Sequence, residues 1–326
     1  MIARGDSMKT ISIAALPWLV LFALACESES HPVAPAIQAM SFAGSEWSEP
    51  VNLGAPVNSA ANEMNPALSP DELSIYFVSN RPGQLGNGDI WVSRRASLDS
   101  PWGEPVNLGP NVNGPGIEAS PMLSIDGHLL FFASVRPDGH GLNDIYVARR
   151  ADKSDDLGWG PAVDLGPDVN TAAFEAGEFY LQSGEGGADN LYFSRGPNTV
   201  ALDIYVAPVK ADGESLGPAM PVTELNDLDP AITDAHPSLR VDGRELFFYS
   251  NRAGSLGASD LYRSVRRSVH EPWSAPENLG TPLSSAANDV QPTLSYSGRT
   301  LVFTSTRAGG LGGSDIWMST RTPSGH

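Results

Sequence analysis

The chain has 326 residues, and its 38 acidic against 20 basic residues give a formal net charge of −18. This charge argues against nucleic acid and anionic membrane surfaces as partners, because both would repel the protein, and it favours a basic or cationic partner. A hydrophobic content of 41% is enough for a core, and 33 glycines and 27 prolines indicate many turns. The single cysteine excludes an intramolecular disulfide.

The first 25 residues are predicted to be a signal peptide, with Met8 as an alternative start. Residues 11–25 form an apolar run behind Lys9 that is short for a membrane span and typical of a secretory signal. The run ends in Ala-Leu-Ala before Cys26, which resembles the bacterial lipobox. The resemblance implies cleavage before Cys26 and attachment of diacylglycerol to it. Ala23 replaces the usual lipobox leucine, so an ordinary signal peptide with an incidental cysteine is the alternative.

The residues after the cysteine are expected to form a tether. Residues 26–45 are polar, contain proline and show no hydrophobic period, which indicates a flexible linker between the lipid and a folded domain at 46–322. By resemblance to enterobacterial lipoproteins, Glu27 implies sorting to the outer membrane, with the domain facing the periplasm or the exterior. We expect a monomer in the cell envelope.

Five similar segments make up the rest of the chain. Each copy has an opening residue and, sixteen residues later, an acid; the successive openings are 55, 57, 59 and 55 residues apart. Such a period indicates a repeat architecture in which no single copy can bury a core alone. The opening residues are Trp47, Trp102, Trp159, Pro218 and Trp273. Four of the five are tryptophans at equivalent places, which favours packing over stacking on a sugar.

Each copy contains three β-type runs and an outer segment. In the first copy, a short run at 66–69 and the strongly β-prone run at 74–79 are separated by a tight turn, which predicts a hairpin. A third run, beginning at Asp89, returns after a glycine-rich loop, and the segment at 102–109 supplies a fourth strand. No stretch shows sustained helical periodicity. The chain is therefore predicted to be all-β, with four-stranded antiparallel units.

Five such units predict a five-bladed β-propeller, which hides its sheet edges by closing a ring. The repeat region begins on an outer-strand segment, 47–54, and ends on a third-strand segment, 315–321. The chain has five outer-strand segments and five three-stranded segments, so every blade has four strands only if the N-terminal segment completes the last blade. We therefore expect the two segments to pair.

The first and fourth copies resemble a known repeat. LSPDELSIYFVSNRPGQLGNGDIWVSRR and LRVDGRELFFYSNRAGSLGASDLYRSVRR are similar to the WD40-like PD40 repeat of TolB-type propellers, with its Ser-Pro-Asp turn, Tyr-Phe strand, Ser-Asn-Arg and later Asp-Ile-Tyr. The resemblance covers residues 47–321 and implies a propeller without specifying an activity. The third copy departs from it, being two residues longer between acid and arginine and lacking both the proline and the Asp-Gly turn, so its inner hairpin is expected to be distorted.

Three polar positions recur in every copy. We expect each arginine to bind two carboxylates as a fork and to pin the glycine-rich loop, because architecture needs five such clusters whereas catalysis needs one. The acids are Glu63, Glu118, Glu175, Asp234 and Asp289; the arginine and later aspartate pairs are Arg81 and Asp89, Arg136 and Asp144, Arg195 and Asp203, Arg252 and Asp260, and Arg307 and Asp315.

The alternative function for the five acids is a carboxylate ring at one mouth of the channel. The residues two places on, Asn65, Ser120, Gly177, His236 and Gln291, would add a polar collar. Unpaired carboxylates this close would have raised pKa values or recruit a cation, and their oxygens suit calcium. We expect no metal or cofactor, with channel calcium as the alternative.

Two functions follow from these patterns. Because every polar feature is repeated, the main prediction is an envelope-anchored, non-enzymatic propeller that binds a protein, a peptide or a cell-wall component. The rim acids and His236 would be its binding residues. The alternative is a carbohydrate-active enzyme, a glycoside hydrolase or lyase, that uses channel carboxylates with Asp234 beside His236 as its acid. That alternative requires two carboxylates in different environments.

Overall fold

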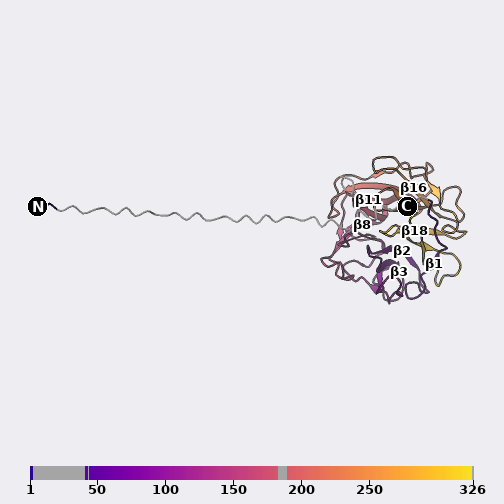
Figure 1. Ribbon diagram of the computed structural model, residues 1–326, viewed down its shortest axis with the longest axis horizontal. Coiled ribbons are helices and arrows are strands. Elements are labelled where there is room, and N and C mark those ends of the chain that lie inside the picture. The colour runs from indigo at the N-terminus through magenta and orange to yellow at the C-terminus, as the bar shows by residue number, and fades with distance from the viewer. Residues whose placement is uncertain (3–40, 43, 183–188, 325–326) are drawn as a thin grey trace. The chain divides into compact units, whose positions relative to one another are not determined.

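The computed structural model describes residues 1–2, 41–42, 44–182 and 189–324, and it contains five four-stranded antiparallel sheets. The sheets are the blades of a propeller (Figure 1), so the predicted all-β, five-bladed fold is confirmed. Cys26 and the expected signal sequence from residue 3 onward lie outside the described residues, as does most of the expected tether. No helix within the described ranges has the length and apolar character needed to cross a membrane.

Each blade runs from an innermost to an outermost strand. Blade one contains β2 (Glu63–Leu68), β3 (Ser74–Ser79), β4 (Asp89–Arg94) and β5 (Val106–Asn107), and blade two contains β6 (Glu118–Leu123), β7 (Leu129–Ser134), β8 (Asp144–Arg149) and β9 (Val163–Asp164). Blade three contains β10 (Phe174–Leu181), β11 (Asp189–Asn198), β12 (Ala201–Val209) and β13 (Met220–Pro221), and blade four contains β14 (Asp234–Leu239), β15 (Glu245–Ser250), β16 (Asp260–Val265) and β17 (Glu277–Asn278). Blade five contains β18 (Asp289–Leu294), β19 (Thr300–Ser305), β20 (Asp315–Thr320) and β1 (Val51–Asn52).

The second strand of each blade is apolar on both faces because blades pack face to face. In β3, Tyr76 packs with Phe132 of blade two, whereas Phe77 packs with Val302 of blade five. All six residues of β3 are buried. A strand covered on both sides reads as a continuous apolar run rather than an alternating one.

The N-terminal strand closes the ring as predicted. Within blade five, β1 pairs antiparallel with β20, with Val51 opposite Met318 and Asn52 opposite Trp317. The Asn52 amide also donates to the Asp315 carboxylate at 2.9 Å. The pairing leaves the third strand of the last blade covered instead of open at its edge.

The opening tryptophans pack against arginines. The guanidinium of an arginine lies 4.1–4.6 Å from the indole centroid in each case, a distance at which cation–π attraction operates. The pairs are Arg321 with Trp47, Arg95 with Trp102, Arg150 with Trp159 and Arg266 with Trp273. The packing role predicted for the tryptophans is confirmed.

Blade three differs from the other four in its outer part more than in its inner hairpin. All five innermost strands share one register shift at the same place, between Ala176 and Phe179 in blade three. The expected distortion is therefore not specific to this blade in the described part; residues 183–188 of its inner turn lie outside the described residues. Instead, β11 and β12 continue to the pair Asn198 and Ala201, where the other blades have a glycine-rich loop.

Candidate functional site

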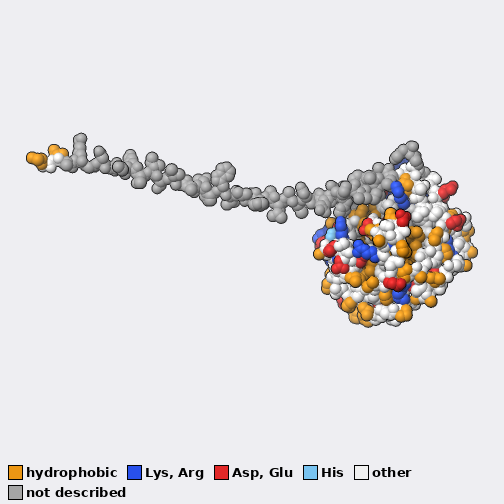
Figure 2. All heavy atoms as spheres, turned by 60° about the horizontal axis from the view of Figure 1, so that its bottom comes forward, with side chains coloured by type: hydrophobic (Ala, Val, Ile, Leu, Met, Phe, Trp, Pro, Cys, Tyr) orange, Lys and Arg blue, Asp and Glu red, His pale blue; other side chains and the backbone are white. Residues whose placement is uncertain are grey.

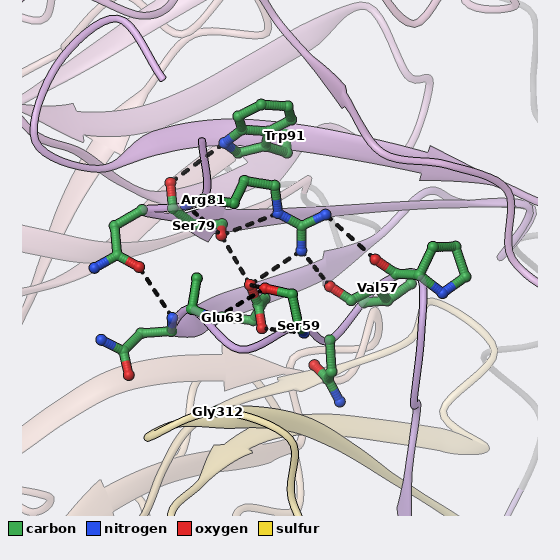
Figure 3. Close-up of polar contacts among 12 residues, drawn as sticks. Val57, Ser59, Glu63, Ser79, Arg81, Trp91 and Gly312 are labelled. Carbon is green, nitrogen blue, oxygen red and sulfur yellow. Dashed lines mark hydrogen bonds and ion pairs between the residues drawn. The ribbon is translucent and has the colours of Figure 1, made fainter. Parts of the chain in front are cut away.

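The five acids lie at the end of the blades where the innermost strands begin, which we call the entry rim. In blade one, the Glu63 carboxylate accepts hydrogen bonds from Arg81 at 3.0 Å, from the Ser79 hydroxyl at 2.8 Å and from the Ser59 hydroxyl at 2.7 Å (Figure 3). The Ser59 amide donates to its other oxygen at 2.8 Å. Arg81 also donates to the Val57 carbonyl. Glu63 is thus fully buried inside its own blade.

The other rim acids have similar surroundings. Arg195 binds Glu175 at 2.8 Å, Arg307 binds Asp289 at 2.6 Å, and Arg252 binds Asp234. Glu118 instead accepts from Ser134 at 2.8 Å, and burial raises its pKa. Burial likewise raises the pKa of Glu175. Each acid is enclosed in a separate cluster, and no group of three or more metal-ligating side chains occurs among the described residues.

Four of the five later aspartates bind the glycine-rich loops without help from the arginines. Asp89 accepts from the Leu85 amide at 2.6 Å, the Gly86 amide at 3.0 Å and the Asn107 side chain at 2.6 Å. Asp144, Asp260 and Asp315 accept from loop amides in the same way. The predicted arginine fork between two carboxylates is therefore wrong, because Arg81 is directed at Glu63 and at backbone carbonyls.

The polar collar closes the channel. The Asn65 amide lies 2.8 Å from His236 Nε2 and 3.3 Å from the Ser120 hydroxyl, and its backbone N–H donates to Gln291 at 3.1 Å. Burial lowers the pKa of His236 to about 3, so its ring is neutral at ordinary pH. Gly177 is the only collar member without a side chain. A Cβ there would lie 3.0 Å from the His236 Cα, so glycine makes room for the imidazole to reach across the axis.

The collar residues share a backbone feature that the sequence did not reveal. Asn65, Ser120, His236 and Gln291 have φ values of 51–60°, in the left-handed region that is rare for residues with a side chain. Each occupies the register shift of its innermost strand, as a β-bulge residue does. The bulge turns these side chains toward one another.

Sequence reasoning missed Glu178, the residue after Gly177. The four other blades have proline there, Pro66, Pro121, Pro237 and Pro292. Glu178 is 3% exposed, and neither carboxylate oxygen has a hydrogen-bond partner among the described residues. Burial raises the pKa of Glu178 well above its usual range, and the residue's own backbone amide lowers it by a smaller amount. The missing proline in the third copy was the available signal.

A pocket of about 310 Å³ opens at the entry rim over blades four, five and one. It is lined by hydroxyl and amide side chains, including Tyr249, Asn251, Asn288 and Thr306, and Gln291 of the collar also borders it. Thr199 and Val200, at the tip of the blade-three hairpin, form one wall. No charged residue lines the pocket.

Asp203 lies on the strand that leads away from this hairpin tip. Unlike its four counterparts it has no glycine-rich loop to bind, and within the described ranges no hydrogen bond or ion pair to its carboxylate is found. Burial and, secondarily, the neighbouring charge of Asp234 raise the pKa of Asp203. Blade three therefore carries a half-buried acid, Asp203, for which no hydrogen bond or ion pair is found in the described part of the chain. Its neighbour Asp234 is bound by Arg252.

Neither the scan against protein-family models nor the search of curated proteins found a match. Solved structures do resemble the chain. An α-L-arabinofuranosidase from Lactobacillus brevis matches with a TM-score of 0.56 and 12% identity over 82% of this chain and 92% of that one. An endo-arabinase from Bacteroides thetaiotaomicron matches with a TM-score of 0.52 and 16% identity over 86% and 98%. At these identities the likeness establishes the fold alone.

These matches correct the functional prediction. The expected non-enzymatic, protein-binding module is overturned, because the similar solved propellers are glycoside hydrolases and favour the enzyme alternative. A putative TolB from Agrobacterium tumefaciens matches with a TM-score of only 0.42 and 20% identity, over 76% of this chain and 72% of that one. Membership in the PD40 or TolB group is therefore not confirmed. The five copies are also not uniform, because blade three has a longer hairpin where the other blades have a glycine-rich loop.

Proposed function

We propose that this propeller is a carbohydrate-active enzyme that hydrolyses glycosidic bonds at the entry-rim pocket. The observation that carries the proposal is the pocket itself, whose hydroxyl and amide lining suits the hydroxyl groups of a neutral sugar. The surface drawn in Figure 2 has its acidic side chains scattered among uncharged and apolar ones. The similarity to an arabinofuranosidase and an endo-arabinase supports pentose-containing glycans as the first substrates to test.

Asp203, which lies on β12 three residues after the pocket residue Val200 and is not itself a lining residue, is the proposed proton donor at the edge of the pocket. A general acid must hold its proton at the working pH, and burial shifts the pKa of Asp203 in that direction. In the proposed step the glycosidic C–O bond breaks and the leaving oxygen takes the proton of Asp203. Water adds its hydroxyl to the anomeric carbon, and the remaining proton passes to the carboxylate or to solvent. Burial is the larger cause of the raised pKa of Asp203, and the negative charge of Asp234, which is bound by Arg252, adds to it.

The test is sugar release from arabinan, arabinoxylan and an aryl α-L-arabinofuranoside. We expect Asp203→Asn to lower kcat by about 100-fold or more, because general acid catalysis contributes about 10²–10⁴-fold. The control is Asp229→Asn, an exposed acid on a connecting loop, which should leave the rate unchanged. If the wild type releases no sugar from any neutral glycan, or if Asp203→Asn is fully active, the proposal is wrong.

We also propose that the protein reaches the cell envelope and is lipid-anchored through Cys26, with the domain facing the periplasm or the exterior. The support is the lipobox-like sequence that ends the apolar run. Radiolabelled palmitate should be incorporated into the wild type and not into Cys26→Ser. Equal labelling of both proteins, or of neither, would contradict the anchor and leave the proposed activity unaffected.

A further inference from the structure

The blade-three hairpin forms a wall that no other blade provides. Its strands remain paired as far as Asn198 and Ala201, with Thr199 and Val200 in the turn. The Val200 amide donates to the Asn198 side chain at 2.8 Å, and the Val200 carbonyl accepts from the Thr233 hydroxyl of blade four at 2.7 Å. The tip is thus fixed against the pocket rather than free to swing away.

In the four other blades the corresponding loop lies flat on its neighbour. A Cβ on Gly86 would lie 2.1 Å from the Gly116 carbonyl oxygen, so only glycine permits this contact. The Asn87 amide then donates to the Gly116 carbonyl at 2.8 Å. Equivalent glycines approach the next connecting segment in the same way: Gly141, Gly257 and Gly312. The four glycine-rich loops are therefore held against the next connecting segments, whereas the tip of the blade-three hairpin borders the pocket.

The floor of the pocket is also closed. Gln291 and Met64 line it, and behind them the collar residues Asn65, Ser120 and His236 are joined by hydrogen bonds across the channel axis. The pocket has a volume of about 310 Å³, near the lower end of the roughly 300–1,000 Å³ of small-molecule pockets. It therefore has room for the end of a glycan and not for a length of polymer.

We infer that the enzyme acts on chain ends or single-sugar branches of neutral glycans, not within a polymer chain. The inference rests on the proposed function. The hairpin tip on one side and the hydrogen-bonded collar across the channel leave room for a terminal sugar and oppose a chain that continues in either of those two directions. Hydrolysis then breaks the bond between the terminal sugar and the rest of the chain, with water supplying the hydroxyl to one product and the hydrogen to the other.

The experiment measures products and viscosity together. Wild-type enzyme should release monosaccharide from linear and branched arabinan while the viscosity of the polymer barely falls. An early loss of viscosity with oligosaccharide products would overturn the inference and leave hydrolysis standing. An absence of product from every neutral glycan would refute the proposed function and the inference with it.

A trimmed hairpin provides the second measurement. Thr199→Ala combined with Val200→Ala keeps the length of the two-residue turn and truncates the two side chains of the wall. We expect kcat/KM for the aryl glycoside to fall by about tenfold, as for the loss of a methylene-sized contact or more in a pocket. Oligosaccharides should then appear among the arabinan products. The control, Val135→Gly, removes an exposed valine from blade two outside the pocket and should change neither. An unchanged product profile in the trimmed enzyme would contradict the wall's role.

Discussion

Replacing Glu178 by glutamine should change how the stability of this protein depends on pH. The wild-type carboxyl group is buried on an innermost strand with no hydrogen-bond partner for either oxygen among the described residues. Ionising it there would leave an unpaired charge in a low-dielectric interior. The folded protein therefore keeps the proton on Glu178 at pH values where the unfolded chain has lost it.

The size and sign of the effect follow from proton linkage. Burial raises the folded-state pKa of Glu178 well above its ordinary value near 4.5. Between those two pKa values the folded state binds one proton more than the unfolded state, so the free energy of unfolding falls as pH rises. The slope is about 1.4 kcal/mol per pH unit for one group. Glutamine does not titrate and removes this slope.

The assay is urea denaturation of wild type and Glu178→Gln at about pH 5 and about pH 6. The difference in unfolding free energy between the two proteins should move in favour of the variant by about 1.4 kcal/mol over that interval. An unpartnered amide has a cost of its own, but that cost is the same at both pH values. The change with pH is therefore the diagnostic quantity.

The matched control is Glu104→Gln, which removes an exposed acid and should show no such change. Parallel stability curves for wild type and Glu178→Gln would refute the reasoning, because they would mean that Glu178 ionises as readily in the folded protein as in the unfolded chain. A steeper slope in the variant would refute it equally.

Three further predictions follow from the fold. Deleting residues 47–54 should expose β20 as an open edge and cause aggregation or a lower Tm in calorimetry; a truncated protein that melts like the parent would contradict closure by β1. Arg81→Ala should leave Glu63 buried without its cation and lower the unfolding free energy by about 3–5 kcal/mol in denaturant titrations. The control, Arg94→Ala, breaks the 3.6 Å ion pair between the exposed Arg94 and Asp156 and should lower it by less than about 1 kcal/mol. His236 has a folded pKa of about 3, below its unfolded value near 6.5, so stability should fall as pH drops from about 6.5 toward 3; a ring-proton NMR titration with a midpoint near 6 would refute this.

Much of the fold could be predicted because the repeat makes each copy a check on the others. Five copies with three β-prone runs each predicted five blades. Because the repeat region begins on an outer-strand segment and ends on a third-strand segment, it also predicted the pairing of β1 with β20; both features are present. Strand periodicity and turn residues act locally, so they are readable in one dimension. The pairing of four of the five rim acids with an arginine was also readable in outline, because the start of the first strand of a hairpin lies beside the end of the second.

What the sequence by itself determined about this protein is its architecture; the tertiary structure decided where chemistry can occur. Repetition concealed the specialised blade, since the pattern of acid, arginine and aspartate survives in blade three although Asp203 has lost its loop. The tertiary structure alone joined Asn65 to His236 across the axis and set the Thr233 hydroxyl against the hairpin tip. These contacts link residues on different blades, and their geometry depends on how the sheets are placed around the axis, which no local pattern encodes.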